Sequence, residues 1–310
     1  MKNIFIWFVF ILVTACSSLP DVTQELEDFE ANQSAFEDVL EDIDSTPFID
    51  RDVYLSLVEL NSVRDDFTRV QFKIVEAQKY LETQKELIAI LQGGEAKEET
   101  QVYFKMYLES LNYYDTALVN YSQGLYQLET YLDYAELDIE YDELNEKFWQ
   151  DTDDFYRYMD LDQYENASQE TENILGYLDR QLEIRDGQYS LIPFSFLSKS
   201  MELDQLYRKY FATAAERLQE DEWPTEAKVY DAIDDIGDEI NVFDMPTSQS
   251  IDEEVDQWYF DHVNSYFTNA DDYFQDGYSE AEDAEEYLDE DLDHELRFKT
   301  FSYAPEKFKG

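Results

Sequence analysis

The sequence has few of the residues that interrupt or crosslink a chain. Its 310 residues include 8 glycines, 6 prolines and 1 cysteine. β-Sandwiches and barrels need a turn about every 8–12 residues, usually marked by glycine or proline, so this scarcity argues against them. A single cysteine also excludes an internal disulfide and a cysteine-based zinc site. The composition therefore favours long helices with few joints.

Signatures of catalysis are lacking as well. The only histidines are His262 and His294, and neither lies near a nucleophile motif such as Gly-x-Ser-x-Gly. No glycine-rich phosphate loop occurs. The segment around Asp272 and Asp276 superficially resembles a calcium loop, but Phe274 stands at its third ligand position. We expect no enzyme activity, no cofactor and no metal site.

Basic residues are scarce. The chain has 74 Asp and Glu against 22 Lys and Arg, a formal net charge of -52, and residues 230–296 contain no Lys or Arg at all. Because proteins neutralise phosphates with clustered Lys and Arg, nucleic acid is excluded as a partner. Three interpretations stay open: a solvated surface suited to a saline habitat, pairing with the chain's own basic residues, or a cationic partner. The basic tail, residues 293–310, is one source of internal pairing.

The amino terminus carries an export-like segment. Lys2 precedes an apolar run from Ile4 to Val13, which is too short for an ordinary membrane-spanning helix. The run ends in Val13-Thr14-Ala15-Cys16, and Cys16 is the chain's one cysteine. No later apolar run is long enough to span a membrane.

This ending resembles the lipobox of bacterial prolipoproteins, in which an aliphatic residue and two small residues precede an obligatory cysteine. The resemblance covers about the first sixteen residues, which match the signal-peptide pattern. It implies diacylglyceryl transfer to Cys16 and cleavage before it, and two acyl chains give durable membrane attachment. We therefore expect the protein on the extracytoplasmic face of the cell membrane or outer membrane, held there by lipid.

The apolar spacing predicts an all-α fold: an elongated bundle of long antiparallel helical hairpins, with shorter helices stacked in a repeat-like way. Apolar residues recur at steps of three and four residues through most of the chain. Helices are predicted over about 22–44, 49–92, 98–137, 141–159, 163–186, 199–219, 225–242 and 250–290. Gly93-Gly94 marks the turn of a long hairpin.

The predicted organisation follows from these joints. It comprises a signal peptide (1–15), a lipid anchor and first helix (16–46), a long hairpin (47–140), shorter helices (141–245), an acidic aromatic helix (246–292) and the basic tail (293–310).

A Tyr-Phe doublet recurs every seven residues in the last long helix. From Phe260 the 3-4 spacing continues through Val263, Phe267, Ala270, Phe274, Gly277, Ala281, Ala284 and Leu288. Large rings alternate with small residues, as packed helices require, so the pattern indicates a buried seam. A ligand groove is the alternative.

Residues 187–198 form an uncharged stretch in a highly charged chain. Six of its side chains would be costly to leave in water: Leu191, Ile192, Pro193, Phe194, Phe196 and Leu197. They are candidate partner contacts, as a docking patch or second membrane contact. The alternative is a loop tucked under the bundle.

The segment containing Tyr164 and Ala167 resembles the inner turn of a tetratricopeptide repeat. The same Tyr-x-x-Ala pattern occurs at Tyr114 and Tyr278, but these positions are not separated by multiples of the 34-residue repeat length. We expect a binding or scaffolding module at the cell envelope, whose partners are the membrane, through its lipid, and a protein or cationic envelope component. An acidic cation carrier or buffer and a tetratricopeptide-like assembly adaptor are the alternatives.

Overall fold

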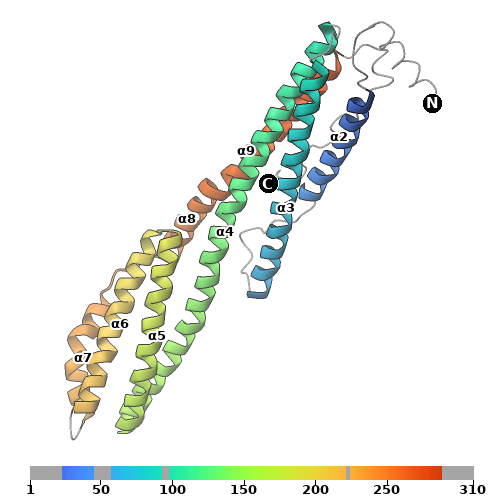
Figure 1. Cartoon of the computed structure of the whole chain (residues 1–310). Helices are drawn as coiled ribbons and strands as arrows, with labels where there is room; N and C mark the ends of the chain where they lie inside the picture. Colours follow the sequence, from blue (N-terminus) through green and yellow to red (C-terminus); the bar gives the residue numbers. More distant parts are fainter. Residues whose placement is uncertain (1–22, 45–56, 93–97, 221–223, 288–310) are drawn as a thin grey trace. The chain divides into compact units, whose positions relative to one another are not determined.

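The fold of the chain is seen in a computed structural model that describes residues 23–44, 57–92, 98–220 and 224–287. Its helices are α2 (Thr23–Asp44), α3 (Leu57–Gln92), α4 (Glu98–Asp160), α5 (Tyr164–Leu191), α6 (Ser195–Glu220), α7 (Glu226–Asn241), α8 (Ser248–Tyr259), the π-helix η1 (Phe260–Asn264) and α9 (Ser265–Glu285). These described ranges contain no strand, which confirms the all-α prediction (Figure 1).

The chain divides into two compact units. Among the described residues, unit 1 comprises 23–44, 62–92, 98–127 and 261–287, and unit 2 comprises 57–61, 128–220 and 224–260. The long helix α4 contributes to both, since its first half belongs to unit 1 and its second half to unit 2.

The predicted joint between helices 98–137 and 141–159 is wrong. The structure has one continuous helix of 63 residues, Glu98–Asp160. Nothing in the sequence ends this helix, because no glycine or proline lies between Gly124 and Asp160. The helix ends at Leu161–Gln163, where Asp162 takes a left-handed φ of 56°.

Unit 1 is built on aromatic contacts to the first half of α4. Phe29 of α2 lies 5.6 Å from Tyr107, and Phe36 lies 5.9 Å from Tyr114, measured between ring centroids. Buried Gln84 of α3 donates to the Phe29 carbonyl oxygen at 3.0 Å. These contacts bury the apolar faces that the spacing predicted for the first three helices.

Helix α9 packs against the same part of α4 through the predicted seam. Phe267 and Phe274 are buried, and their rings lie 5.0 Å from Tyr121 and 5.9 Å from Tyr114, respectively. The interpretation of this ladder as core packing is confirmed for all described seam members from Val263 to Ala284.

Phe260, the predicted start of the seam, is instead 63% exposed, and its neighbour Tyr259 is buried. The cause is the π-helix over Phe260–Asn264, which inserts one extra residue into the turn. The buried face therefore moves back by one residue, and the prediction for Phe260 is corrected.

Unit 2 contains antiparallel hairpins formed by α5, α6 and α7, which lie side by side in Figure 1. Their core with the second half of α4 is made of Phe148, Phe155, Met159, Ala167, Ile174, Leu178, Phe211, Ala214, Leu218, Val229 and Ile233. At the edges, arginines join neighbouring helices: Arg180 of α5 bonds Glu140 of α4 at 2.8 Å.

A carboxylate from α8 caps the start of α6. Glu254 Oε1 accepts the Ser195 backbone N–H at 2.6 Å, and its Oε2 accepts the Ser195 hydroxyl at 2.8 Å. The first N–H groups of a helix have no partner within it and attract negative charge. Glu254 thus provides, from another helix, the hydrogen-bond acceptor that a residue just before the helix usually provides.

Candidate functional site

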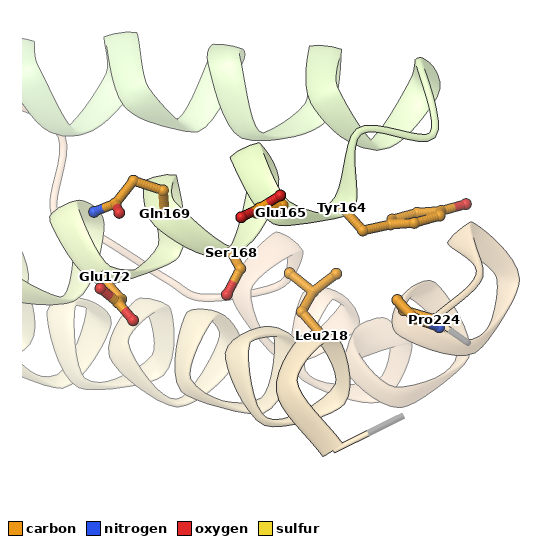
Figure 2. A pocket seen from close by; sticks show the side chains of 7 residues that line it. All are labelled: Tyr164, Glu165, Ser168, Gln169, Glu172, Leu218 and Pro224. Carbon is orange, nitrogen blue, oxygen red and sulfur yellow. The ribbon is translucent and has the colours of Figure 1, made fainter. Parts of the chain in front are cut away.

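A pocket opens in unit 2 beside the first turns of α5. It has a volume of about 410 Å³ and is lined by Tyr164, Glu165, Ser168, Gln169, Glu172, Leu218 and Pro224. The first five residues come from α5, Leu218 comes from the end of α6, and Pro224 precedes α7. Figure 2 shows Leu218 projecting from α6 toward the α5 residues.

The pocket combines a negative wall with apolar contacts. Glu165 and Glu172 stand two turns apart on α5, with Ser168 between them, and no Lys or Arg lines the pocket. Leu218 and Pro224 provide apolar surface opposite. Such a lining suits a group that is positively charged at one end and apolar along its length, as Lys and Arg side chains are.

Hydrogen bonds of Tyr164 hold one end of the pocket. Its hydroxyl donates to Asp162 Oδ1 at 2.5 Å and accepts the Glu226 backbone N–H at 3.2 Å. The bond to Asp162 raises the pKa of Tyr164, because deprotonation would abolish it. The starts of α5 and α7 are therefore tied together through this one hydroxyl.

The other end of the pocket is held more loosely. Glu172 Oε1 accepts the side-chain amide of Gln219, from α6, at 3.5 Å, the outer limit of a hydrogen bond. Glu165 is exposed on the first turn of α5. Both carboxylates thus keep oxygen lone pairs available to a bound cationic group.

Four of the six candidate contact residues in the 187–198 stretch are covered in the structure. Ile192, Phe194, Phe196 and Leu197 are buried, and only Leu191 and Pro193 are exposed. The irregular part is also shorter than predicted, since α5 extends to Leu191 and α6 begins at Ser195.

These buried side chains form a second small core of unit 2. The Phe194 ring stacks on Phe196 at 5.4 Å and meets the edges of Tyr134 at 5.3 Å and Trp258 at 6.2 Å. Burying each such ring stabilises the fold by roughly 1.5–3 kcal/mol. Exposing the ring to a partner would lose this stabilisation. The alternative of a stretch tucked under the helices is the one that fits.

The remaining predicted site residues lie elsewhere. Cys16 and the lipobox residues Val13, Thr14 and Ala15 fall outside the described residues, as do His294 and the basic tail. His262 is exposed on the π-helix. The segment that resembled a calcium loop is part of the continuous helix α9, so it cannot wrap around an ion as such a loop does.

Sequence reasoning did not identify the pocket residues as a site. One signal pointed to the segment: the Tyr164/Ala167 pair, which resembled a tetratricopeptide turn. Ala167 is fully buried where α5 packs against its neighbours, as that pattern implies. The pocket itself needs Leu218 and Pro224 from two other helical segments, and no local pattern links these to α5.

The described residues also bear on membrane-spanning and metal-binding sites. No described helix combines the length and the apolar character needed to cross a membrane. No three acidic, His or Cys side chains in the described ranges are grouped so as to hold a metal ion. Comparison with known protein families, curated proteins and solved structures found no match to this chain.

Proposed function

We propose that this chain is a lipid-anchored, extracytoplasmic helical protein that acts as a binding or scaffolding module at the cell envelope. In this proposal Cys16 carries the lipid and unit 2 contacts a basic, partly apolar segment of a partner protein. The lipobox-like sequence Val13-Thr14-Ala15-Cys16 supports the anchor. Two acyl chains, at about 0.8 kcal/mol per buried CH₂, suffice for stable attachment of a protein that an anionic membrane surface would repel.

The observation that carries the binding role is the pocket on α5, where Glu165 and Glu172 face apolar Leu218 and Pro224. A basic side chain entering it would place its aliphatic part against the two apolar residues and its charge beside the carboxylates. The composition of the chain favours the same partner, because residues 230–296 contain 24 acidic residues and no Lys or Arg. The hairpins of α5, α6 and α7 support a scaffold or adaptor role rather than a catalytic one.

A peptide-binding experiment tests the binding role. The probe is a labelled synthetic peptide of alternating Lys and Leu, and its affinity is measured by fluorescence anisotropy at about 0.05 M and about 0.5 M NaCl. The double variant Glu165→Gln/Glu172→Gln should weaken binding roughly tenfold at low salt, because it removes two contacts to the cation.

The control is Asp231→Asn/Asp235→Asn, which removes two exposed charges from α7. It should change affinity by less than about threefold, since an exposed charge that does not line the pocket acts only through screened attraction. Equal losses in both variants would contradict binding in the pocket and leave only diffuse attraction.

The anchor is tested separately by mass spectrometry of the protein purified from its native membrane. A mature chain that begins at Cys16 and carries acyl groups is the expected result. A chain with an unmodified Cys16 thiol would overturn the anchor without affecting the peptide-binding result.

A further inference from the structure

A carboxylate is buried in the interior of unit 2. Asp204 of α6 is only 5% exposed, although it carries an acidic side chain. Its one hydrogen-bond donor among the described side chains is the Tyr141 hydroxyl of α4, 3.3 Å from Oδ1 and 3.5 Å from Oδ2. One long hydrogen bond, shared between the two oxygens and donated by a neutral hydroxyl, offsets little of the cost of removing a carboxylate from water.

The nearby cation is engaged with another carboxylate. Arg185 of α5 donates from Nη1 to Asp138 Oδ1 at 3.1 Å and to Gln188 Oε1 at 2.7 Å. Its guanidinium carbon lies 3.4 Å from the centre of the Tyr141 ring. Gln188 also donates to Asp138 at 3.0 Å, which fixes that pair further. Asp204 therefore receives only the longer-range attraction of Arg185.

Each packed helix contributes charged or titratable groups around this point. Helix α4 supplies Asp138, Asp142 and Tyr141, α5 supplies Arg185, and α6 itself adds Tyr207 one turn beyond Asp204. Three carboxylates thus share one guanidinium. Burial and the neighbouring Asp138 also raise the pKa of Asp142, so a second member of the group resists ionisation.

Two donors on α5 are buried without a partner as well. Gln181 Nε2 and Arg185 Nε lie one turn apart, and neither has an acceptor among the described residues. Gln181 is only 1% exposed. The interior between α4, α5 and α6 is therefore polar but incompletely paired, an arrangement whose stability depends on the charge state of its members.

We propose that Asp204 is a proton-binding site in the core of unit 2, and that it takes up a proton from water in weakly acidic surroundings and thereby stabilises the packing of α4, α5 and α6. A protonated carboxyl is neutral and can donate its O–H to the Tyr141 hydroxyl oxygen, so it costs less to bury than the carboxylate does. Burial raises the pKa of Asp204 to about 6, while Arg185 and Tyr141 lower it by less.

The sign of the pH dependence follows directly. The folded state holds the proton up to a pH of about 6, whereas the unfolded chain releases it near 3.8, the ordinary pKa of an aspartate side chain. Proton binding therefore favours folding fully below the unfolded pKa, and this contribution is lost as the pH rises through about 6. The two pKa values correspond to a shift of about 100-fold in the unfolding equilibrium.

The test is urea unfolding of the full chain at pH values from about 7.5 to about 4.5, followed by circular dichroism. Asp204→Asn mimics the protonated carboxyl. At pH 7.5 this variant should have an unfolding equilibrium constant about 10- to 100-fold smaller than the natural chain, and the difference should shrink steadily toward pH 4.5. Asp179→Asn is the control, because Asp179 also faces α6, through Arg208, but is exposed.

The control variant should follow the pH profile of the natural chain. A second measurement avoids dependence on the variant's folding: the carboxyl ¹³C resonance of Asp204 in the natural chain should titrate near pH 6. A midpoint near pH 4, or an Asp204→Asn variant that is less stable than the natural chain at every pH, would overturn the proposal.

Discussion

At the scale of single residues, the packing of α9 on α4 depends on two glycines. A Cβ at Gly277 would lie 3.2 Å from Tyr114 Cζ and 3.3 Å from the Ser110 backbone oxygen, closer than ordinary contacts. Ser110 also donates its hydroxyl to the Gly277 carbonyl oxygen at 2.6 Å. A Cβ at Gly124 would meet the buried Phe267 ring at 3.1 Å. The two helices approach closely at these points because there is no side chain between them.

The first prediction concerns Gly277→Ala. We expect it to lower the free energy of unfolding by about 1–3 kcal/mol, because the new methyl group pushes against a buried ring and a backbone carbonyl. Gly176→Ala is the matched control, since a Cβ there has no neighbour within 4 Å. The control should raise stability by about 0.5–1 kcal/mol, as alanine favours a helix interior. Urea unfolding checks both, and equal effects would contradict the close approach.

The sequence could not predict which individual side chains pair with each other in the interior. The composition pointed to helices, but it could not show that Arg185 pairs with Asp138 while Asp204 is left to a hydroxyl. Any of the 74 acidic residues was an equal candidate for burial. The choice is made by the order in which α4, α5 and α6 pack, which local spacing does not encode.

At the scale of elements, the π-helix resets the register of the last helical segment. Ahead of it Tyr259 faces the interior, and after it Val263 and Phe267 do so at successive steps of four. A regular 3-4 seam would have buried Phe260. One extra residue in a single turn therefore decides which ring of the Tyr-Phe doublet is covered.

The second prediction tests this register. Phe260→Ser should change the free energy of unfolding by less than about 0.5 kcal/mol, because the ring is already 63% exposed. Phe274→Ala, at the equivalent doublet position two repeats later, should cost about 3–5 kcal/mol, since that ring is buried against Tyr114. Thermal unfolding of the two variants separates the cases. Comparable losses would mean that the regular seam holds and that Phe260 is covered.

The sequence predicted the existence of the elements well and their joints less well. Helix ends marked by proline or capping residues, as at Glu226–Asn241, agree within a residue or two with the prediction. The break inside α4 was predicted wrongly, although no glycine or proline marks one there, and the irregular turn at Phe260 was missed because no glycine or proline marks it. An irregular helical turn that results from tertiary packing cannot be recognised from the local amino-acid composition.

The same limit applies to the candidate sites. Apolar character singled out residues 187–198 as important, and they are, but as core rather than as surface. The number of apolar side chains in a segment does not reveal whether another element covers them. Here the cover is α8, which lies well downstream in the chain.

At the scale of the whole molecule, charge repulsion opposes folding. The formal net charge is -52, and the ion pairs described between helices, such as Lys85–Asp115 at 2.8 Å, involve only some of the acidic residues. Exposed ion pairs contribute about 0–1 kcal/mol each, so they do not balance this excess. Repulsion should therefore dominate the response of the protein to salt.

The third prediction follows from this balance. Raising NaCl from about 0.02 M to about 0.5 M should increase the free energy of unfolding by urea, because it shortens the screening length from roughly 20 Å to roughly 4 Å. Sucrose at matched osmolarity is the control and should give a smaller gain. A decrease in stability with NaCl would show that the attractive pairs outweigh the repulsion.

The bond between Glu254 and Ser195 has a consequence for biogenesis. A chain emerges amino terminus first, so the start of α6 is made well before the carboxylate 59 positions later that completes it. During that interval Phe194, Phe196 and Leu197 lack the contacts that Trp258 and the rest of α8 make with them in the folded protein. A nascent chain therefore exposes this apolar segment until α8 has been synthesised. Chaperones that bind exposed apolar segments should bind there during synthesis and not after release.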